Sequence, residues 1–476
     1  MNKTNRTYTK RMTRRRKAFI AALRGVFAGV FPFLFVSALV FFTGVPGVTQ
    51  EIHTDAQPQA LSIVDAYLRM AAENNPELKS IEHALQARRE RIPQAGALPD
   101  PEISIGYFIN PDDPDTFLGR FSVSAMQMFP WYNTRQTRQD EQSALATEQF
   151  YLLENRRNML FAEIQTTWFD YTALELTIEI IRENRDLVAD LSSIVQIRYE
   201  TARAGTADLL RMQMEDRRLK TRIENIEDRK HAIRARFNEL TNRHPAAPIE
   251  TPNDLPPRHP AWSETELAAL VKQRNPELEA LGAREKAAGH RAALARLEGL
   301  PDIGIGIEVM GRDFTSMAMM PEVKEGYVGM MSIKVPLYRS SYDAKIRQAL
   351  QEKHAITQSK TQAANRLSRQ TEEALVNWRQ SERELRLLDE ELIPRAQQAL
   401  SVLREEYGAG NVGFDAVLQM HRELLDLSIE RVAVLTEQNK AAAEIEYLYA
   451  AGRPSEDGTQ GKNTYGMPRR ERQHNH

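Results

Sequence analysis

The stretch "NNPELKSI" occupies residues 74–81, and a close copy, "RNPELEAL", occupies residues 274–281. Each copy opens a charged helical stretch that ends at a Leu-Pro-Asp tripeptide, at residues 98–100 in one case and 300–302 in the other. The same order of sequence features then follows each tripeptide. The recurrence predicts a duplicated chain, with two copies of one structural plan.

Two short alternating segments follow each Leu-Pro-Asp. Apolar side chains stand at every second position, as in Ile103 and Ile105 or Ile303 and Ile305, with small or polar residues between them. A period of two is typical of β-strands. The sequence therefore predicts strands at about residues 101–109, 117–129, 302–311 and 326–335, the second strand of each pair ending at a proline.

A very long helix is predicted after each strand pair. Between Trp131 and Arg243 there is no proline and one glycine, Gly205. A ladder with a spacing of seven is apolar at six of its seven steps: Leu153, Leu160, Thr167, Leu174, Ile181, Val188 and Val195. Such a ladder indicates a coiled-coil seam. A helix from about Thr134 to Ala204 would be on the order of 100 Å long at 1.5 Å per residue.

The second half carries a matching long helix, expected from Arg339 to Tyr407. A small turn and a return helix follow in both halves. The predicted organisation is a signal peptide and N-terminal segment at 1–56, a first repeat at 57–242, an extended proline-rich linker at 243–260, a second repeat at 261–452 and a disordered polar tail at 453–476.

The first fifty residues have the order of an export signal. A basic region around Arg14 to Lys17 precedes an apolar stretch from about Gly25 to Val48. Cleavage is expected between about Thr49 and Gln57, and an uncleaved anchor is the alternative. The chain has no cysteine, which excludes disulfides, a catalytic thiol and a lipid-modified cysteine. The formal charge of −2, with both signs interleaved, argues against a nucleic-acid partner.

The predicted strands have the length of membrane-crossing strands, about 9–11 residues. One face is apolar and the other carries small, polar and charged residues, which is typical of a water-lined barrel in lipid. Four strands cannot close a barrel, since about eight are needed, so several chains must share one; three chains supply twelve strands. The candidates for lipid-facing positions are Ile103, Ile105, Phe121, Val123, Ile303, Ile305 and Ile333.

Several motifs occur in the same order twice. These are the two Asn-Pro-Glu-Leu helices, "MFPWYNTRQTRQ" (128–139) with "KVPLYRSSYDAKIRQA" (334–349), and "RYETARAGTADLL" (198–210) with "REEYGAGNVGFDAVL" (404–418). On these motifs the chain resembles the TolC-type outer-membrane efflux family over about residues 58–452. The segments "AGALPDPEISIGYF" and "MQMFPWYNT" are most similar to its cation-efflux branch of CusC and CzcC type.

The resemblance implies a mainly α-helical fold with a β-barrel part. A homotrimer would form a twelve-stranded barrel in outer-membrane lipid, continuous with a long helical barrel in the periplasm. The implied partners are a periplasmic adaptor (membrane fusion protein) and an inner-membrane pump of the resistance-nodulation-division type. The implied function is a passive exit duct without a cofactor, with heavy-metal cations as the substrate class of the finer branch. The alternative is a periplasmic coiled-coil scaffold without a pore.

The family also implies a gate at the periplasmic tips of the helices. Its pattern is an aromatic residue, a glycine three positions on and an acid about nine on. Tyr199 with Asp208 and Tyr407 with Asp415 are the gate or selectivity candidates. The alternative is that each aspartate simply caps a returning helix. The candidates for adaptor docking lie in the two turns: Gly205, Thr206, Gly410 and Gly413.

This sequence departs from the gate pattern at two points. Ala202 stands where a glycine is expected, and Val412 stands where some members of the family carry an arginine. The charge link of the gate is therefore an open question at this point.

No enzyme signature occurs. The segment "GIGIEVMG" at 304–311 lacks the third glycine of a nucleotide loop, and no HExxH or GxSxG motif is present. Methionines crowd the strand regions: Met126, Met128, Met310, Met317, Met319, Met320, Met330 and Met331. Thioethers bind Cu(I), but methionine is also an apolar filler. Because no fixed spacing accompanies these residues, no metal site is predicted, nor is one predicted at the terminal His-Asn-His.

Overall fold

The structure, a computed structural model, describes residues 56–108, 120–201, 205–258, 263–312 and 326–450. All of these belong to one compact unit that begins at Thr54. The expected export signal, Ala202, the polar tail with its His-Asn-His, and Met317, Met319 and Met320 lie outside the described residues.

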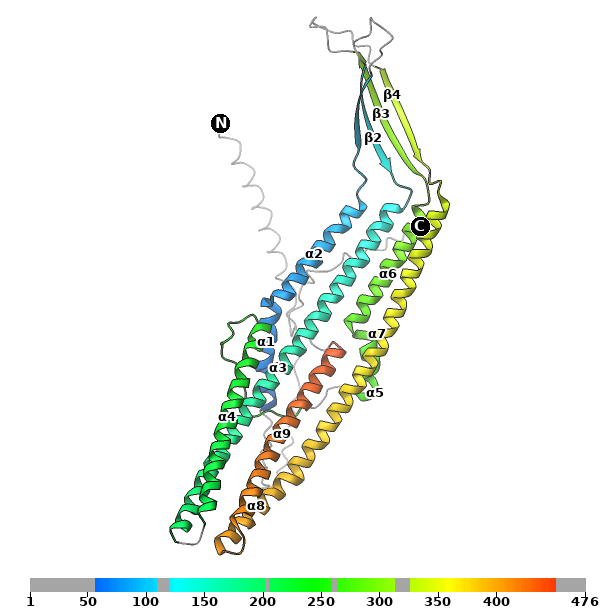
Figure 1. Ribbon diagram of the computed structural model, residues 1–476. Helices are drawn as coiled ribbons and strands as arrows, with labels where there is room; N and C mark the ends of the chain where they lie inside the picture. Colours follow the sequence, from blue (N-terminus) through cyan, green and yellow to red (C-terminus); the bar gives the residue numbers. More distant parts are fainter. Residues whose placement is uncertain (1–55, 109–119, 202–204, 259–262, 313–325, 451–476) are drawn as a thin grey trace, which may run out of the picture. The chain divides into compact units, whose positions relative to one another are not determined.

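The same order of elements occurs twice along the chain (Figure 1). The first half consists of α1 (Ala56–Asn74), α2 (Pro76–Gly96), β1 (Glu102–Phe108), β2 (Arg120–Phe129), α3 (Thr134–Glu200) and α4 (Thr206–Leu240). The second half consists of α5 (Glu264–Arg274), α6 (Pro276–Leu297), β3 (Asp302–Arg312), β4 (Gly326–Lys334), α7 (Arg339–Leu387), the π-helical segment η2 (Leu388–Leu392), α8 (Ile393–Ala409) and α9 (Phe414–Leu448).

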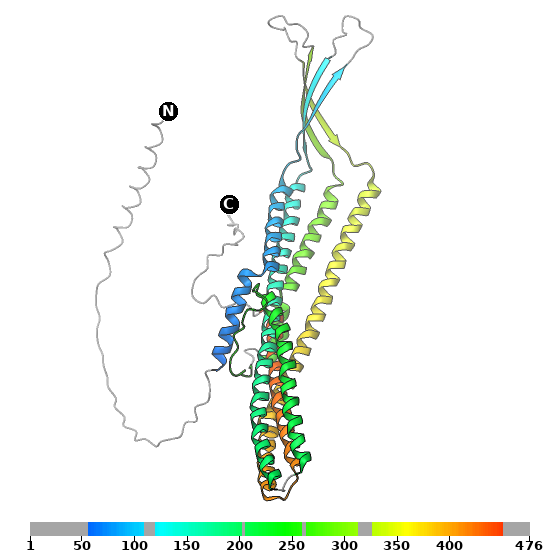
Figure 2. The same ribbon diagram turned by 60° about the vertical axis from the view of Figure 1, so that its left-hand side comes forward.

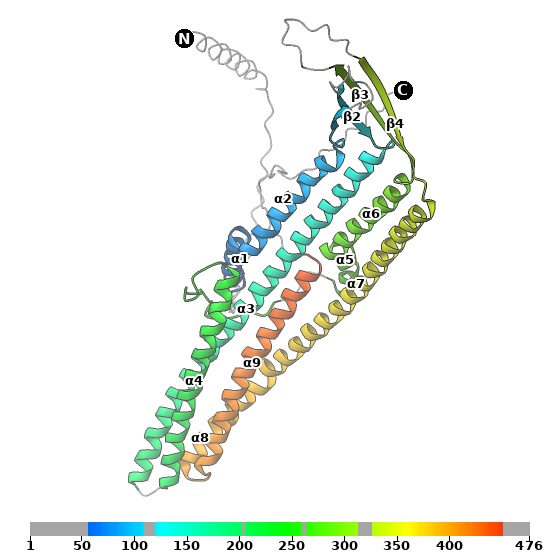
Figure 3. The ribbon, with the colours of Figure 1, turned by 45° about the horizontal axis from the view of Figure 1, so that its top comes forward.

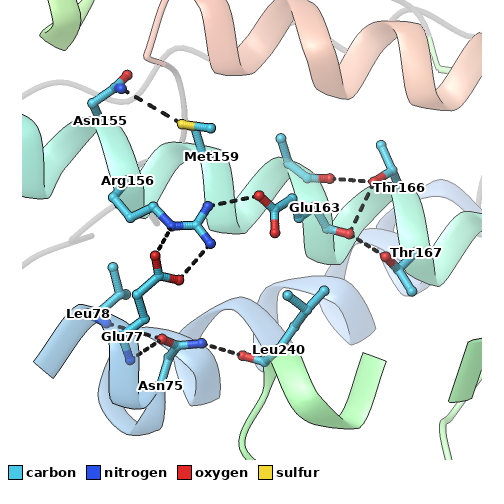
Figure 4. A network of polar contacts seen from close by, with 11 residues as sticks. Asn75, Glu77, Leu78, Asn155, Arg156, Met159, Glu163, Thr166, Thr167 and Leu240 are labelled. Carbon is cyan, nitrogen blue, oxygen red and sulfur yellow. Dashed lines mark hydrogen bonds and ion pairs between the residues drawn. The ribbon is translucent and has the colours of Figure 1, made fainter. Parts of the chain in front are cut away.

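The first Asn-Pro-Glu-Leu motif forms a joint between three helices (Figure 4). Asn75 Oδ1 accepts hydrogen bonds from the backbone N–H groups of Glu77 and Leu78, at 2.9 and 3.1 Å. These bonds cap α2, which begins at the following proline. Asn75 Nδ2 donates to the carbonyl oxygen of Leu240 at 2.9 Å, and Leu240 is the last residue of α4. One side chain therefore ties the start of α2 to the end of the return helix.

The glutamate of the same motif adds a link to α3. Arg156, on α3, reaches Glu77 Oε2 at 2.6 Å and Glu163 Oε1 at 2.8 Å. The hydrogen bond and charge of Arg156 lower the pKa of Glu77, against an opposing effect of burial. The joint thus connects α2, α3 and α4.

The second motif builds the same joint. Asn275 Oδ1 accepts from the N–H of Glu277 at 3.0 Å, and Asn275 Nδ2 donates at 2.9 Å to the carbonyl oxygen of Leu448, the last residue of α9. Glu277 pairs with Arg366 of α7. We call Asn75 with Leu240, and Asn275 with Leu448, the asparagine clamps. The motif recurs because each half needs this joint.

The seven-residue ladder of α3 faces the interior along the whole helix. Leu153, Leu160, Thr167, Ile181, Val188 and Val195 are buried, and Leu174 is packed at the edge of the core. Towards the strands the ladder packs in a cluster with Leu85 of α2 and Phe237 of α4. Towards the tip it packs against Leu219 of α4 and Leu418 of α9. The spacing of seven therefore marks the buried side of α3.

The two halves share their core. α9 lies between α3 and α7 in the views of Figures 1 and 3. Leu418 of α9 belongs to a cluster with Ile181 of α3, and Ile445 of α9 belongs to another with Leu367 and Trp378 of α7. None of the helices among the described residues is long and apolar enough to cross a membrane.

The long helix of the second half is not uniform. The structure has a continuous helical stretch where the sequence predicts one, from Arg339 to Tyr407, and η2 widens it between α7 and α8. Pro394 follows in the first turn of α8. Proline has no N–H to donate and crowds the preceding turn, so a π-helical segment accommodates it. α3 contains no proline and stays α-helical throughout.

The proline-rich linker is packed rather than a free spacer. Ile249 and Leu255 are buried in the core of the first half. Trp168 Nε1 donates to the carbonyl oxygen of Glu250 at 3.0 Å, and Trp378 Nε1 donates to that of Arg258 at 3.2 Å. The segment has no regular helix or strand as far as residue 258, but a tryptophan of α3 binds its middle and a tryptophan of α7 binds it near its end.

The four strands form one antiparallel sheet in the order β1-β2-β3-β4. Ile105 pairs with Val123, Val123 with Val309, and Val309 with Tyr327. Odd-numbered residues therefore share one face across all four strands, and even-numbered residues share the other. Because every pair joins two odd-numbered or two even-numbered residues, the apolar odd positions of the strands all lie on the same face of the sheet.

Candidate functional site

The two turns that the sequence singles out lie together at the end of the helices away from the sheet (Figure 2). Gly410 has φ 87°, a left-handed conformation that favours glycine at a helix C-terminus. Gly205 and Gly413 precede α4 and α9 in extended conformations, and Thr206 is the first residue of α4. The four docking candidates therefore surround the two helix-turn-helix tips.

The two candidate aspartates are brought together by an arginine. Arg211 Nη1 lies 2.7 Å from Asp415 Oδ1 and 3.3 Å from Asp208 Oδ1. Asp208 Oδ2 also accepts from the N–H of Gly205 at 3.4 Å, a long bond in the capping position. Asp208 thus takes part in both a cap and a charge link, while Asp415 is largely exposed and held from the other half of the chain.

The two candidate tyrosines lie in different surroundings. The guanidinium of Arg198 stands 4.3 Å from the ring centre of Tyr407, a cation–π distance, and donates to the backbone carbonyl oxygen of Tyr407. The ring of Phe414 packs at 5.6 Å on the same tyrosine. Tyr199 is exposed. Arg198 and Arg211 of the first half therefore both bind groups of the second half.

A buried polar group lies further along the helices from the tips. His421 of α9 is 1% exposed. Burial lowers its pKa, and the charge of Arg404 lowers it further; the nearby backbone of Asn184 and the charge of Glu215 act in the opposite direction. Glu215 is itself buried and accepts from Arg422 Nε at 2.9 Å.

At the other end of the molecule the sheet has one apolar face. The seven lipid-facing candidates all carry odd numbers and lie on it, with Ile103, Ile105, Ile305 and Ile333 more than half exposed. Exposed Tyr107, Ile307, Tyr327 and Met331 extend the same face. An apolar surface of this extent on a folded chain indicates that something else covers it.

The opposite face of the sheet is small and polar with four methionines. Its residues among the paired positions include Ser104, Gly106, Ser122, Ser124, Met126, Met128, Gly304, Gly306, Glu308, Met310, Met330 and Ser332. This side is less exposed than the apolar face: Ser122 is buried and Met126 and Met128 are half-buried.

Aromatic side chains mark the junction between the strands and the long helices. Tyr132 and Tyr338 are 88% and 82% exposed, and they follow Pro130 and Pro336 at equivalent positions. Trp131 and Leu337 beside them are also exposed. Within the described part of the chain, no group of three or more histidine, aspartate or glutamate side chains could hold a metal ion.

Comparison with known proteins gives a consistent result. Residues 267–450 match the family described as outer membrane efflux protein. Among solved structures, the outer-membrane channel OprN is 16% identical with a TM-score of 0.71, covering 82% of this chain and 90% of that one. CusC is 13% identical with a TM-score of 0.72, covering 82% of this chain and 92% of CusC. The CmeC outer membrane channel of Campylobacter jejuni is 12% identical with a TM-score of 0.70, covering 90% of this chain and 96% of CmeC.

The family match thus covers residues 267–450, and over 82% of its length the chain has the fold of these outer-membrane channels. No curated protein sequence matches it. That the chain is not an enzyme stays a prediction. CusC and OprN resemble the chain to the same degree, so its placement in the cation-efflux branch of the family stays a prediction.

Three residues that shape the helix tips and the core beside them were missed in the sequence. Arg211 follows Asp208 by three positions on α4, a spacing that brings side chains together on a helix and could have suggested the link. Arg198 stands directly before Tyr199, but its partner lies 209 positions away. His421 gives no local signal, because its burial depends on helices of both halves.

Proposed function

We propose that the chain is the outer-membrane exit duct of a tripartite efflux system. The observation that carries this is the sheet: one continuous apolar face is exposed on all four strands while the other is small and polar. In lipid, an apolar outer face and a polar inner face are what a water-lined barrel requires. The match of residues 267–450 to the outer membrane efflux protein family and the fold shared with OprN and CusC support the same function.

Three copies would complete the barrel. In the described residues, β1 and β4 each pair with one neighbour only, which leaves a free edge on both sides of the sheet. An unpaired edge in hydrocarbon costs several kcal/mol per backbone group. A homotrimer places β4 of one protomer beside β1 of the next and gives twelve strands. The exposed Tyr132 and Tyr338 would then form an aromatic belt at the periplasmic lipid boundary.

The helices would form the periplasmic tunnel, with their tips facing the partners. The turns around Gly205 and Thr206, and around Gly410 and Gly413, are the proposed contacts with a periplasmic adaptor. An inner-membrane pump, of the resistance-nodulation-division type in the proposed assembly, would supply the energy. The substrate class we propose is cationic, on the finer resemblance to the CusC and CzcC branch.

Charge at the tip is the proposed source of cation preference. Three protomers bring three copies of Asp208 and of Asp415 into a narrow mouth, where a ring of carboxylates attracts cations. Arg211 neutralises part of this charge, since it contacts both aspartates. The two groups should therefore act in opposite directions on ion selectivity.

Planar-bilayer recordings in a salt gradient test this. Asp208→Ala combined with Asp415→Ala should shift the reversal potential towards weaker cation preference, and Arg211→Ala should shift it towards stronger preference. Arg211→Lys, which keeps the charge, is the matched control. An unchanged reversal potential in both variants would mean that the aspartates only cap their helices. If the wild type showed no conductance at all, the proposed duct would be wrong.

The lipid-facing assignment has its own test. Ile305→Lys places a charge on the apolar face, at a cost of roughly 2–4 kcal/mol near the middle of a bilayer. Because three copies are needed per assembly, trimer yield in the outer-membrane fraction should collapse. Ser104→Lys, on the opposite face of the sheet, should assemble. Normal trimer yield for Ile305→Lys would mean that this face never meets lipid.

A periplasmic coiled-coil scaffold is the second candidate. The buried ladder of α3 favours it as much as it favours a tunnel, but a scaffold leaves the exposed apolar sheet face without a cover. Cell fractionation separates the two: the duct remains in the outer membrane after a high-salt wash, whereas the scaffold is released.

A further inference from the structure

Four methionines lie on the small, polar face of the sheet, where an apolar filler has no obvious use. The opposite face takes isoleucine, valine, phenylalanine and tyrosine, as a surface that meets hydrocarbon would. On the polar face the paired positions are serine, glycine and charged residues for the most part, and the large apolar side chains among them are mainly methionine. The choice of a flexible thioether on this face therefore needs a separate explanation.

Two of the sulfur atoms converge. Ser332 Oγ lies 3.4 Å from Met126 Sδ and 3.8 Å from Met128 Sδ, so one hydroxyl on β4 faces the lone pairs of two thioethers on β2. The strand between them contributes no side chain at this point, because Met128 pairs with Gly304 and Gly304 pairs with Ser332.

Gly304 makes room for this arrangement. A Cβ atom at this position would stand 2.3 Å from Ser332 Oγ, 2.7 Å from Met128 Sδ and 3.4 Å from Met126 Sδ. Both sulfur atoms thus lie around one point above the glycine. The β2 and β4 strands are two inter-strand spacings apart, roughly 10 Å, which methionine side chains can bridge only where the intervening residue is glycine.

The next row of the sheet repeats the pattern. Met126 pairs with Gly306, and Gly306 pairs with Met330. Met330 therefore faces Met126 across a second glycine, on the same face as the first pair. Met126, Met128 and Met330 therefore occupy the positions that flank the two glycines of β3 on this face.

We propose that Met126, Met128 and Met330 form a binding site for a soft monovalent cation, Cu(I) or Ag(I). Thioether sulfur is a soft ligand that selects Cu(I) over the harder cations that oxygen ligands prefer. Thioethers carry no charge, so they have no proton to release, and the site binds without a change in protonation. Cation binding at this site does not depend on the proposed duct function. A role for the site in export does rest on that function, in which this face of the sheet lines the lumen.

The sheet provides a matched control within one strand. Met330 and Met331 are neighbours on β4, but they lie on opposite faces, and Met331 is 69% exposed on the apolar face. Met331→Leu removes a thioether without touching the site. Met126→Leu with Met128→Leu removes the two convergent sulfur atoms and keeps the volume and polarity of the side chains close to those of the wild type.

The test is Cu(I) binding to the full chain in detergent, measured by competition with a colorimetric Cu(I) chelator, together with X-ray absorption at the copper edge. The chain has 16 methionines, and some of the others can also bind Cu(I). The number of Cu(I) ions bound per chain is therefore compared between each variant and the wild type. The wild type and Met331→Leu should bind one more Cu(I) per chain than the double variant, with sulfur neighbours at about 2.3 Å, the usual metal–sulfur distance. Removing two ligands should weaken this site by more than the roughly 10–100-fold typical of outer-shell changes.

Equal Cu(I) binding by the double variant and the wild type would overturn the proposal, and so would a wild type that binds no Cu(I). Trimer mobility on gels without heating checks that the variants assemble. If the double variant does not assemble, the single variants Met126→Leu and Met128→Leu should each lower the number of sulfur neighbours by one. If the protein conducts ions but binds no Cu(I), the metal site is wrong and the duct stands. If it binds Cu(I) but does not conduct ions, the duct is wrong and the metal site stands.

Discussion

The two halves of the chain are alike at the asparagine clamps and unlike at the tips. Each clamp joins elements of one half: Asn75 reaches Leu240, and Asn275 reaches Leu448. At the tips the contacts run between the halves, since Arg198 binds Tyr407 and Arg211 binds Asp415.

The difference follows from what duplication can copy. A contact inside one repeat is copied with the repeat, so both clamps use the same residues. A contact between repeats needs a donor on one side and an acceptor on the other, so the two sides must differ. The sequence agrees: Arg198 precedes Tyr199, whereas Glu406 precedes Tyr407. The tips are therefore the place where the halves have specialised.

The clamps should dominate stability. Asn275→Ala removes a helix cap, worth about 1 kcal/mol, and leaves the buried carbonyl of Leu448 unpaired, at about 1–3 kcal/mol. Asn75→Ala should cost less, because its bond to Leu240 is only partly buried. The thermal midpoint of the full chain in detergent, followed by circular dichroism, measures both.

Asn74→Ala is the control for the clamp, since the side chain of Asn74 bonds the exposed carbonyl of Met70. Its midpoint should stay close to that of the wild type, within about 0.5 kcal/mol. If all three variants have the same midpoint, the clamps are not joints and the motif recurs for another reason.

The region between clamp and tip should respond to acid. The pKa of His421 is lowered by burial, so the unfolded chain takes up this proton before the folded chain does. Its contribution to stability is complete above the ordinary histidine pKa of about 6.5 and is lost as pH falls from there through the lowered pKa of the folded state. The thermal midpoint should drop between pH 7.5 and pH 5.5, and His421→Leu should reduce the drop.

His83, exposed on α2, serves as the comparison for that experiment. His83→Gln should show the pH dependence of the wild type. The same slope in His421→Leu and in the wild type would mean that His421 does not govern acid sensitivity.

The tip pairs should matter little to stability, in contrast to the clamps. Arg211 and Asp415 are both well exposed, and exposed ion pairs contribute about 0–1 kcal/mol. A double-mutant cycle of Arg211→Ala and Asp415→Ala should give a coupling energy below about 1 kcal/mol. A larger coupling would make the tip a structural joint like the clamps.

A similarly small effect is expected at the ion pair beside the first clamp. Arg156 lowers the pKa of Glu77, so this pair stabilises the fold above the ordinary glutamate pKa and the contribution is lost as pH falls below it. With half of the Glu77 side chain exposed, Glu77→Gln should cost less than about 1 kcal/mol at pH 7. Midpoints of variant and wild type should converge near pH 3; a gap that persists there would exclude the ion pair as its cause.

Local patterns in the sequence predicted the strands and the buried side of α3, because spacings of two and seven directly report which side chains face inward. The packing of residues 245–258 and the π-helical segment before Pro394 were not predictable in this way. Both depend on what the segment meets in three dimensions. Likewise the aspartates of the tip stood out in the sequence, but the link from Arg211 to Asp415 became apparent only when the two halves were placed side by side.

The central claim is that one chain supplies too few strands to close a barrel. Native mass spectrometry of the detergent-solubilised, full-length protein tests it most directly. The expected result is a trimer that stays intact until the detergent is stripped away. A stable monomer, with the apolar face of its sheet in water and no detergent bound, would contradict the account.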